Sequence, residues 1–147
     1  MSQSAHNKSV VTSLLDRVWS QGDAAASDEY VASHYTIFHD PGDPWEGRVL
    51  TLQQYRERVI QSRAPFPDQR FDIQHLVSEG EDVAVAWLWK GTHLGEVGGF
   101  PPTGRVITMS GMTLYRFEEG LSIGHWQCTD RLGVFGQLRQ AAAASRP

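Results

Sequence analysis

Three polar side chains that could act on a substrate alternate along one segment near the C-terminus. His125, Gln127 and Thr129 are separated by single residues, so a strand would place them on one face of a sheet. An unperturbed imidazole has a pKa of about 6.5, so His125 could exchange protons near neutral pH. A neutral amide has no proton-accepting role there, but Gln127 could bind a carbonyl or hydroxyl group. The pattern predicts acid–base chemistry at His125, with Gln127 orienting a substrate oxygen.

Two side chains in this segment have a second interpretation. His125 could be a core histidine whose two nitrogens are both hydrogen-bonded. Asp130 is three residues after Gln127, so a regular strand would point the two side chains to opposite faces of the sheet. The Asp130 carboxylate is therefore more typical of a group that fixes the end of the strand or pairs with Arg131 or Arg105. We keep both residues as catalytic candidates.

Two further candidates stand before a loop rich in proline and glycine. His39 and Asp40 precede Pro41, and loops often carry catalytic groups at the mouth of a cavity. Asp40 before a proline is also an ordinary turn residue. We therefore predict that His39 and Asp40 are catalytic residues or turn residues.

Strands dominate the second half of the chain. Alternating side chains predict a strand over residues 71–77, followed by strands over residues 82–95, 105–118 and 121–130. The strand from residue 82 is apolar on both faces, so we expect helices to cover one face and a second subunit or another chain segment to cover the other.

Helices dominate the first half. Apolar residues at helical spacing predict a helix over residues 9–21 that is capped by Gly22, and a short second helix over residues 23–34. Residues 35–47 begin like a strand and then break into a loop. A capping box predicts a third helix over residues 51–63, and the tail beyond Asp130 predicts a terminal turn with a frayed end.

Helices followed by a run of hairpin strands favour one α+β domain over residues 1–147, with helices packed on one face of a curved antiparallel sheet. Such an arrangement leaves a cone that can hold a ligand. Small-molecule sites are mostly apolar with a few placed polar groups. The side chains predicted to line this cone are Tyr35, Phe38, Trp45, Trp87, Trp89 and Met109.

Composition excludes several functions. A net charge of −4 and a pI near 5.8 argue against nucleic-acid binding. The single cysteine, Cys128, cannot form an internal disulfide and suits a reducing cytoplasm. The sequence contains no apolar run of membrane-spanning length, no signal-peptide pattern, no zinc-binding histidine spacing and no phosphate-binding glycine motif. We expect a cytoplasmic protein without a metal.

The second half of the chain contains, in order, the segments FPDQRF, GTHLGEVGGFPPTGR and SGMTLYRFEEG, and then HW followed by Asp130 and FGQL. In this order and spacing they resemble the SnoaL-like polyketide (ester) cyclase family, over about residues 66–138. This resemblance implies a nuclear transport factor 2-like cone with no metal or organic cofactor, and a homodimer packed through the outer sheet face. In characterised members, an acidic residue two places after the motif histidine deprotonates a polyketide methyl ester, and the enolate closes a ring by aldol addition. That place is Gln127 here. Positions on the preceding strand that tend to be polar in cyclases hold Gly111 and Thr113, which we predict to contact the substrate.

These observations predict a cofactor-independent enzyme that cyclises or isomerises a lipophilic, carbonyl-bearing intermediate of natural-product metabolism. Two alternatives remain open. The same cone could host water addition, dehydration or epoxide opening by His125 with Asp130 or Asp40. It could also be a non-catalytic binding or dimerisation module that has lost its base.

Overall fold

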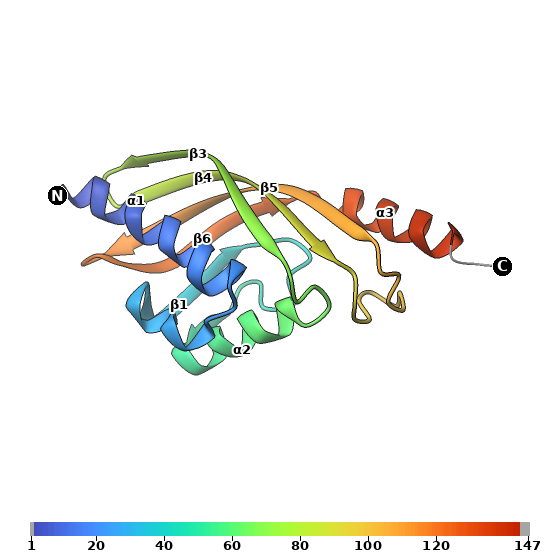
Figure 1. The fold of residues 1–147 in the computed structure, drawn as a ribbon. Coiled ribbons are helices and arrows are strands. Elements are labelled where there is room, and N and C mark those ends of the chain that lie inside the picture. The colour runs from blue at the N-terminus through green and yellow to red at the C-terminus, as the bar shows by residue number, and fades with distance from the viewer. Residues whose placement is uncertain (1, 145–147) are drawn as a thin grey trace.

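A curved six-stranded sheet with helices on its concave side forms the body of the protein. The chain is described by a computed structural model that covers residues 2–144. The strand order is β2-β1-β6-β5-β4-β3, in which β1 and β6 are parallel and all other neighbours are antiparallel. Figure 1 shows α1 and α2 below the sheet and α3 continuing away from its end. The predicted α+β cone, with N-terminal helices on the concave face, is confirmed.

The strands of the second half form as predicted, with small shifts at their ends. They are β3 (Arg70–Glu79), β4 (Asp82–Thr92), β5 (Val106–Glu118) and β6 (Leu121–Thr129). The inward side chains of β4, from Val83 to Trp89, are buried, whereas Leu88 on the outer face is 48% exposed. The expectation that a second chain covers the outer face stays a prediction.

The first predicted helix forms but begins earlier. Helix α1 (Gln3–Ser13) starts after Ser2, whose hydroxyl accepts a hydrogen bond from the Ala5 backbone N–H, and it continues as the π-helix η1 (Leu14–Ser20). Gly22 follows with a φ of 83°, a left-handed conformation that glycine adopts without strain. This confirms the predicted glycine cap.

The second predicted helix is largely wrong. A short 3-10 helix, η2 (Ala24–Glu29), is followed at once by strand β1 (Val31–His39). Val31, Tyr35 and Ile37 are buried there, and the strand pairs with β6 and with the short β2 (Val49–Thr51). The alanine-rich composition was outweighed by these long-range pairings, which a local pattern cannot reveal.

The third predicted helix is confirmed as α2 (Leu52–Arg63). The Thr51 hydroxyl accepts from the Gln54 backbone N–H, and the Gln54 side chain accepts from the Thr51 backbone N–H, which completes the capping box. No helix within residues 2–144 is long and apolar enough to cross a membrane.

The C-terminal prediction of a turn and a frayed tail is wrong for residues 131–144, which form the regular helix α3 (Arg131–Ala144). The Gln137 side chain accepts from the Thr108 backbone N–H and donates to the Thr108 carbonyl. These two hydrogen bonds attach α3 to the backbone of β5. Leu138 of this helix is buried. Residues 145–147 of the predicted tail lie outside the described residues.

Candidate active site

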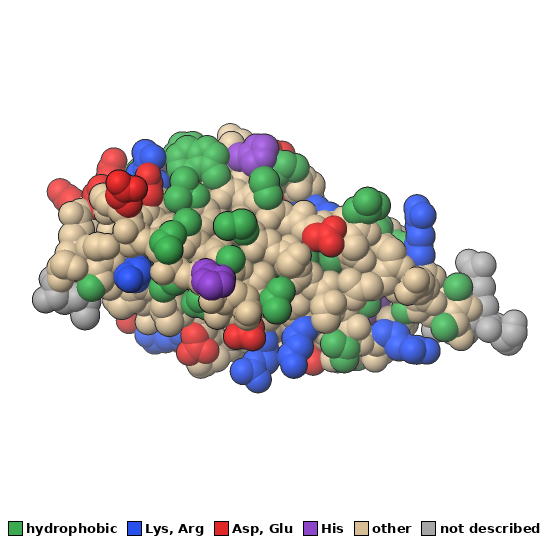
Figure 2. Space-filling model, turned by 90° about the horizontal axis from the view of Figure 1, so that it is seen from above, with side chains coloured by type: hydrophobic (Ala, Val, Ile, Leu, Met, Phe, Trp, Pro, Cys, Tyr) green, Lys and Arg blue, Asp and Glu red, His purple; other side chains and the backbone are tan. Residues whose placement is uncertain are grey.

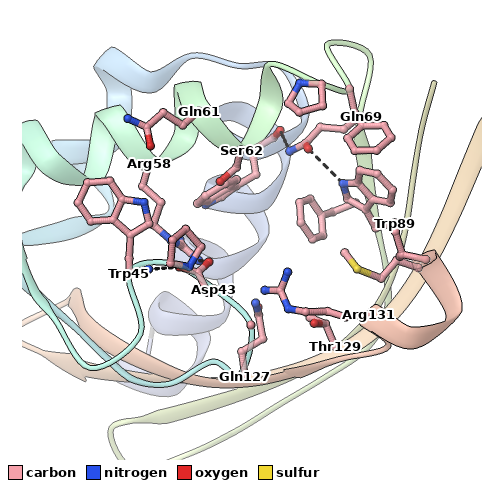
Figure 3. A pocket seen from close by; sticks show the side chains of 18 of the residues that line it. Asp43, Trp45, Arg58, Gln61, Ser62, Gln69, Trp89, Gln127, Thr129 and Arg131 are labelled. Atoms are coloured by element: carbon pink, nitrogen blue, oxygen red, sulfur yellow. Dashed lines mark hydrogen bonds and ion pairs between the residues drawn. The ribbon is translucent and has the colours of Figure 1, made fainter. Parts of the chain in front are cut away.

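A cavity of about 670 Å³ lies between the concave face of the sheet and the helices. Figure 3 shows polar side chains from α2, β6 and the start of α3 pointing into it beside aromatic rings. This volume is ample for a small organic molecule. The predicted residues that line it are Tyr35, Trp45, Trp87, Trp89, Met109, His125 and Gln127.

The predicted alternation of side chains between the two faces of β6 is correct. His125, Gln127 and Thr129 all line the cavity, and Cys128 between them is exposed on the outer face. The period-two alternation of strand side chains therefore places the imidazole and the amide on the same wall.

Two predicted substrate contacts lie elsewhere. Phe38 is 40% exposed and stacks on Trp126, with the ring centroids 4.2 Å apart, outside the cavity. Gly111 is paired with Trp87 across β4 and β5, and a Cβ at Gly111 would collide with the Trp87 indole. The glycine makes room for the indole and is not itself part of the cavity lining.

Two predicted catalytic candidates also lie away from the cavity. The His39 side chain is 49% exposed, with its Nδ1 3.8 Å from a Glu46 carboxylate oxygen. Asp130 is exposed, and its Oδ1 accepts a hydrogen bond of 2.9 Å from the Gly133 backbone N–H at the start of α3. Asp130 thus fixes the end of the strand and caps the helix, which is the structural alternative considered for it.

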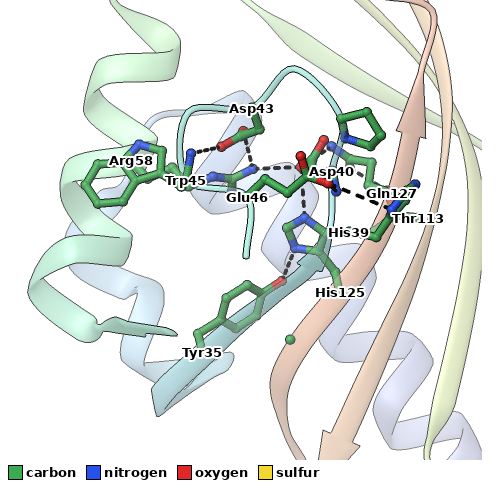
Figure 4. A network of polar contacts seen from close by, with 12 residues as sticks. Tyr35, His39, Asp40, Asp43, Trp45, Glu46, Arg58, Thr113, His125 and Gln127 are labelled. Carbon is green, nitrogen blue, oxygen red and sulfur yellow. Dashed lines mark hydrogen bonds and ion pairs between the residues drawn. The ribbon is translucent and has the colours of Figure 1, made fainter. Parts of the chain in front are cut away.

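Asp40 is the centre of a buried polar network rather than a residue of the cavity mouth. Its side chain has no solvent exposure. Its Oδ2 accepts from His125 Nε2 at 3.0 Å, from Gln127 Nε2 at 3.1 Å and from Arg58 Nη2 at 3.3 Å, and its Oδ1 accepts from Arg131 Nη2 at 3.4 Å. Figure 4 shows Arg58 from α2 and both His125 and Gln127 from β6 converging on Asp40 in the loop after β1. A carboxylate with four donors and no competing acceptor is held in its ionised form.

A chain of hydrogen bonds determines how Gln127 is oriented. Trp87 Nε1 can only donate, and it does so to Thr113 Oγ1 at 2.9 Å. The Thr113 hydroxyl therefore gives its proton to Gln127 Oε1 at 2.6 Å, which leaves the amide nitrogen toward Asp40. Thr113, predicted as a substrate contact, is buried behind Gln127 and positions its amide.

Arg58 donates a hydrogen bond to Asp40 and also lines the cavity. Its Nη2 also donates to Asp43 Oδ2 at 3.0 Å, and its guanidinium lies 5.1 Å from the Trp19 ring centroid. The Arg58 side chain is only 7% exposed, so its charge is matched within the protein by the two carboxylates. Arg58 and Asp43 both line the cavity.

Proton affinities in this network follow from burial and from its charges. Burial lowers the pKa of His125 below its usual value even though Asp40 opposes the change, so the imidazole is neutral near pH 7. Burial would raise the pKa of Asp40, but the hydrogen bond and charge of His125, with the Arg58 and Arg131 guanidinium groups, lower it overall. Burial also raises the pKa of Tyr35 well above that of free tyrosine.

Sequence reasoning missed Arg58, Asp43 and Arg131. One signal was available, because Arg58 lies three residues after Tyr55 and therefore on the apolar face of a predicted helix. No local pattern indicated that a loop and the first residue of a C-terminal helix would meet there. In the described part of the chain, no three His, Cys, Asp or Glu side chains are grouped so that they could hold a metal ion.

Comparisons with known proteins agree with this architecture. The family model described as SnoaL-like polyketide cyclase matches residues 9–138, and thus extends from within α1 to within α3. A solved structure of a candidate polyketide cyclase from Acidithiobacillus ferrooxidans is 54% identical over 97% of this chain and 100% of that chain, with a TM-score of 0.91. IdmH, a candidate polyketide cyclase from Streptomyces antibioticus, is 26% identical over 90% of this chain and 98% of its own, with a TM-score of 0.78.

A more distant structure supports the fold alone. AclR, a candidate hydroxylase from Streptomyces galilaeus, is 18% identical over 93% of this chain and 83% of its own, with a TM-score of 0.78. Comparison with curated proteins finds no matching sequence.

Proposed function

Because the chain belongs to the SnoaL-like polyketide cyclase family, we propose that it cyclises or isomerises a lipophilic, carbonyl-bearing intermediate of natural-product biosynthesis without a cofactor. One observation carries this proposal. A neutral imidazole, His125, is hydrogen-bonded to an ionised and fully buried carboxylate, Asp40, at the wall of a large aromatic cavity. This pair can accept a proton from a carbon acid and stabilise the imidazolium that results.

The proposal resolves the lack of an acidic residue at position 127. The Gln127 amide nitrogen lies 3.1 Å from Asp40 Oδ2, so a carboxylate from the loop after β1 reaches the position beside this side chain. In the proposed reaction, the substrate loses a proton next to a carbonyl group, and the electron pair of that C–H bond forms an enolate. The enolate carbon then attacks a second carbonyl, and the proton held by the protein returns to the new alkoxide.

The amide and the aromatic wall would orient the substrate. Gln127 uses its oxygen for Thr113 and one N–H for Asp40, which leaves its second N–H for a substrate oxygen on the cavity side. Trp87 and Trp89 supply apolar surface that would fold a flexible substrate and bring its reacting carbons together. Such positioning alone can lower a barrier by several kcal/mol.

We also propose that the protein is a homodimer packed through the outer face of the sheet. Figure 2 shows hydrophobic side chains spread over this face. Val77 is 62% exposed, Leu88 48% and Met112 62%, and they come from three adjacent strands. Sedimentation velocity tests this, because Leu88→Glu together with Met112→Glu should give a monomer from a dimeric wild type. A monomeric wild type at micromolar concentration contradicts it.

Proton exchange tests the proposed chemistry without knowledge of the natural substrate. We choose 2-tetralone, a lipophilic bicyclic ketone, and follow loss of its α-proton signal in D₂O by NMR. The wild type should accelerate exchange over buffer, and His125→Gln should remove about 100-fold or more of that acceleration. Asp130→Asn is the matched control, because it alters an exposed carboxylate outside the cavity and asparagine still caps α3.

Two results would count against catalysis. If 2-tetralone binds, as seen from shifts of the cavity tryptophan signals, but exchanges no faster than in buffer, the protein is a binding module. If His125→Gln exchanges 2-tetralone as fast as the wild type, the acid–base assignment is wrong.

A further inference from the structure

Two side chains with N–H groups lie next to each other on the cavity wall. Gln127 Nε2 donates to Asp40 Oδ2 at 3.1 Å, and Arg131 Nη2 donates to Asp40 Oδ1 at 3.4 Å. Because both contact the same carboxylate, the amide and the guanidinium are neighbours. Both residues line the cavity, and Figure 3 shows their side chains pointing into it.

Arg131 keeps hydrogen-bond donors that the described part of the chain does not use. A guanidinium has five N–H groups in one plane. Arg131 Nε donates to the Pro41 carbonyl at 2.8 Å and Nη2 donates once to Asp40, so three of the five N–H groups remain. No acceptor within residues 2–144 takes a hydrogen bond from Nη1. The side chain is 38% exposed, so a ligand in the cavity can reach these donors.

Thr129 does not add to this pair of donors. It lies between Gln127 and Arg131 in the sequence and also lines the cavity, but its hydroxyl oxygen is buried and has no hydrogen-bond partner within residues 2–144. A ligand could not reach that oxygen unless the wall rearranged. On this part of the wall, the accessible groups are therefore the N–H groups of the amide and the guanidinium, and such groups bind an acceptor oxygen.

The surrounding charges favour an oxygen that becomes negative during the reaction. Arg58 pairs with Asp40 and Asp43. Arg131 also pairs with Asp40, so two positive charges are matched by two negative charges while His125 is neutral. When the network takes up a proton from the substrate, it gains one positive charge and the substrate gains one negative charge. An interaction that strengthens only at this point lowers the reaction barrier.

We propose that Arg131 is a catalytic residue and that, with Gln127, it binds the substrate carbonyl oxygen that becomes the enolate oxygen. This inference rests on the proposed function, since it names the groups that hold the reacting carbonyl. The proton of the α-C–H bond passes to the pair of His125 and Asp40, and its electron pair moves to the carbonyl oxygen, which accepts an N–H from each side chain. On ring closure the negative charge moves to the new alkoxide, which takes the proton back.

Binding of 2-naphthol tests this site without any turnover. 2-Naphthol is the fully aromatic relative of 2-tetralone, and its ionised form carries its charge on the oxygen that corresponds to the enolate oxygen. The naphtholate absorbs at longer wavelength than the protein, so pH titrations with and without excess protein give the pKa of the bound and of the free ligand. The wild type should bind naphtholate about 10- to 100-fold more tightly than naphthol, which lowers the pKa of the bound ligand correspondingly.

Three substitutions assign this preference to named groups. Arg131→Gln and Gln127→Met each remove donors from the site, and each should reduce the preference for naphtholate about ten-fold. Arg131→Gln should also slow the exchange of 2-tetralone by about 100-fold or more, as the loss of a donor to a developing oxyanion does. Arg139→Gln is the matched control, because it removes the same charge from the same helix at an exposed position outside the cavity.

The ratio of the two affinities separates substrate contact from a structural role. If Arg131→Gln weakens naphthol and naphtholate by the same factor, Arg131 only holds the Asp40 loop and the inference is refuted, while the proposed function stands on the exchange of 2-tetralone by the wild type. A wild type that binds both forms equally, or neither form, also refutes it. If the wild type prefers naphtholate but exchanges 2-tetralone no faster than buffer does, the proposed function fails and the catalytic role of Arg131 fails with it.

Discussion

Replacement of Asp40 by asparagine tests the buried network most directly. Asparagine has the same shape, so the change creates no cavity. Its amide, however, cannot satisfy the surroundings in either orientation, because Arg131 donates to Oδ1 and three donors, including Arg58 and His125, meet at Oδ2. An NH₂ group placed on either side faces a donor. The substitution also leaves Arg58, which is 7% exposed, with one carboxylate in place of two.

The expected magnitude follows from this burial. Removing one partner of a buried ion pair costs about 3–5 kcal/mol, since the remaining charge stays away from water. For a domain of this size, such a loss lowers Tm by about 6–20 °C. Urea unfolding followed by tryptophan fluorescence measures the free energy of unfolding, and calorimetry measures Tm. The exposed Asp130→Asn change should stay within about 0.5 kcal/mol of the wild type.

A small effect would refute the reasoning. If Asp40→Asn unfolds within about 1 kcal/mol of the wild type, the carboxylate is not a buried anion whose charge the network requires. The proposed role of His125 would then lose its basis, because it depends on an ionised Asp40 that accepts from Nε2.

Four further substitutions have effects whose signs follow from the structure. Burial lowers the pKa of His125 in the folded protein, so on acidification the unfolded chain takes up a proton at a higher pH than the folded chain does. The free energy of unfolding should therefore fall by up to about 1.4 kcal/mol per pH unit as pH drops below about 6.5. His125→Gln should flatten this slope, as measured by urea unfolding. Gln127→Glu places a second carboxyl beside Asp40, which should raise the pKa of one of them, so this variant should lose stability relative to the wild type as pH rises from 5 to 8. Gly111→Ala should destabilise the protein by about 1–3 kcal/mol, because the added methyl group displaces the Trp87 indole. Gly136→Ala should stabilise it by about 0.5–1 kcal/mol, because alanine favours the helical conformation of α3 and its methyl group meets only open space.

Each of these measurements can fail in a defined way. An unchanged pH slope in His125→Gln would show that another group titrates. A Gln127→Glu variant whose stability follows the wild type at every pH would mean that the two carboxyl groups are not close. Equal effects of alanine at Gly111 and Gly136 would remove the steric reason given for Gly111.

Strand periodicity and local capping made much of the fold predictable. The alternation around His125 and Gln127 identified the cavity wall because a period of two leaves only one choice of face. The capping box at Thr51 located the start of α2 because both of its hydrogen bonds are made within four residues. Such features depend on neighbours in the sequence.

The parts that depend on distant residues could not be predicted. Within α2 the apolar Ile60 is 61% exposed, whereas the charged Arg58 is buried. The reason is that Asp40 and Asp43, which are 18 and 15 residues earlier, supply the charges that allow an arginine to be buried there. Hydropathy alone cannot show that such partners will be present.

The same long-range dependence explains how the carboxylate of the site is held. Asp40 is on a loop, and a loop has no periodicity that would aim its side chain. Arg131, the first residue of α3, donates from Nε to the Pro41 carbonyl at 2.8 Å and from Nη2 to Asp40. A Cβ at Gly42 would collide with the Arg131 side chain, so the glycine permits this close approach. The helix that looked like a frayed tail therefore fixes the loop that presents Asp40 to His125, and the site cannot be assembled from the strands alone.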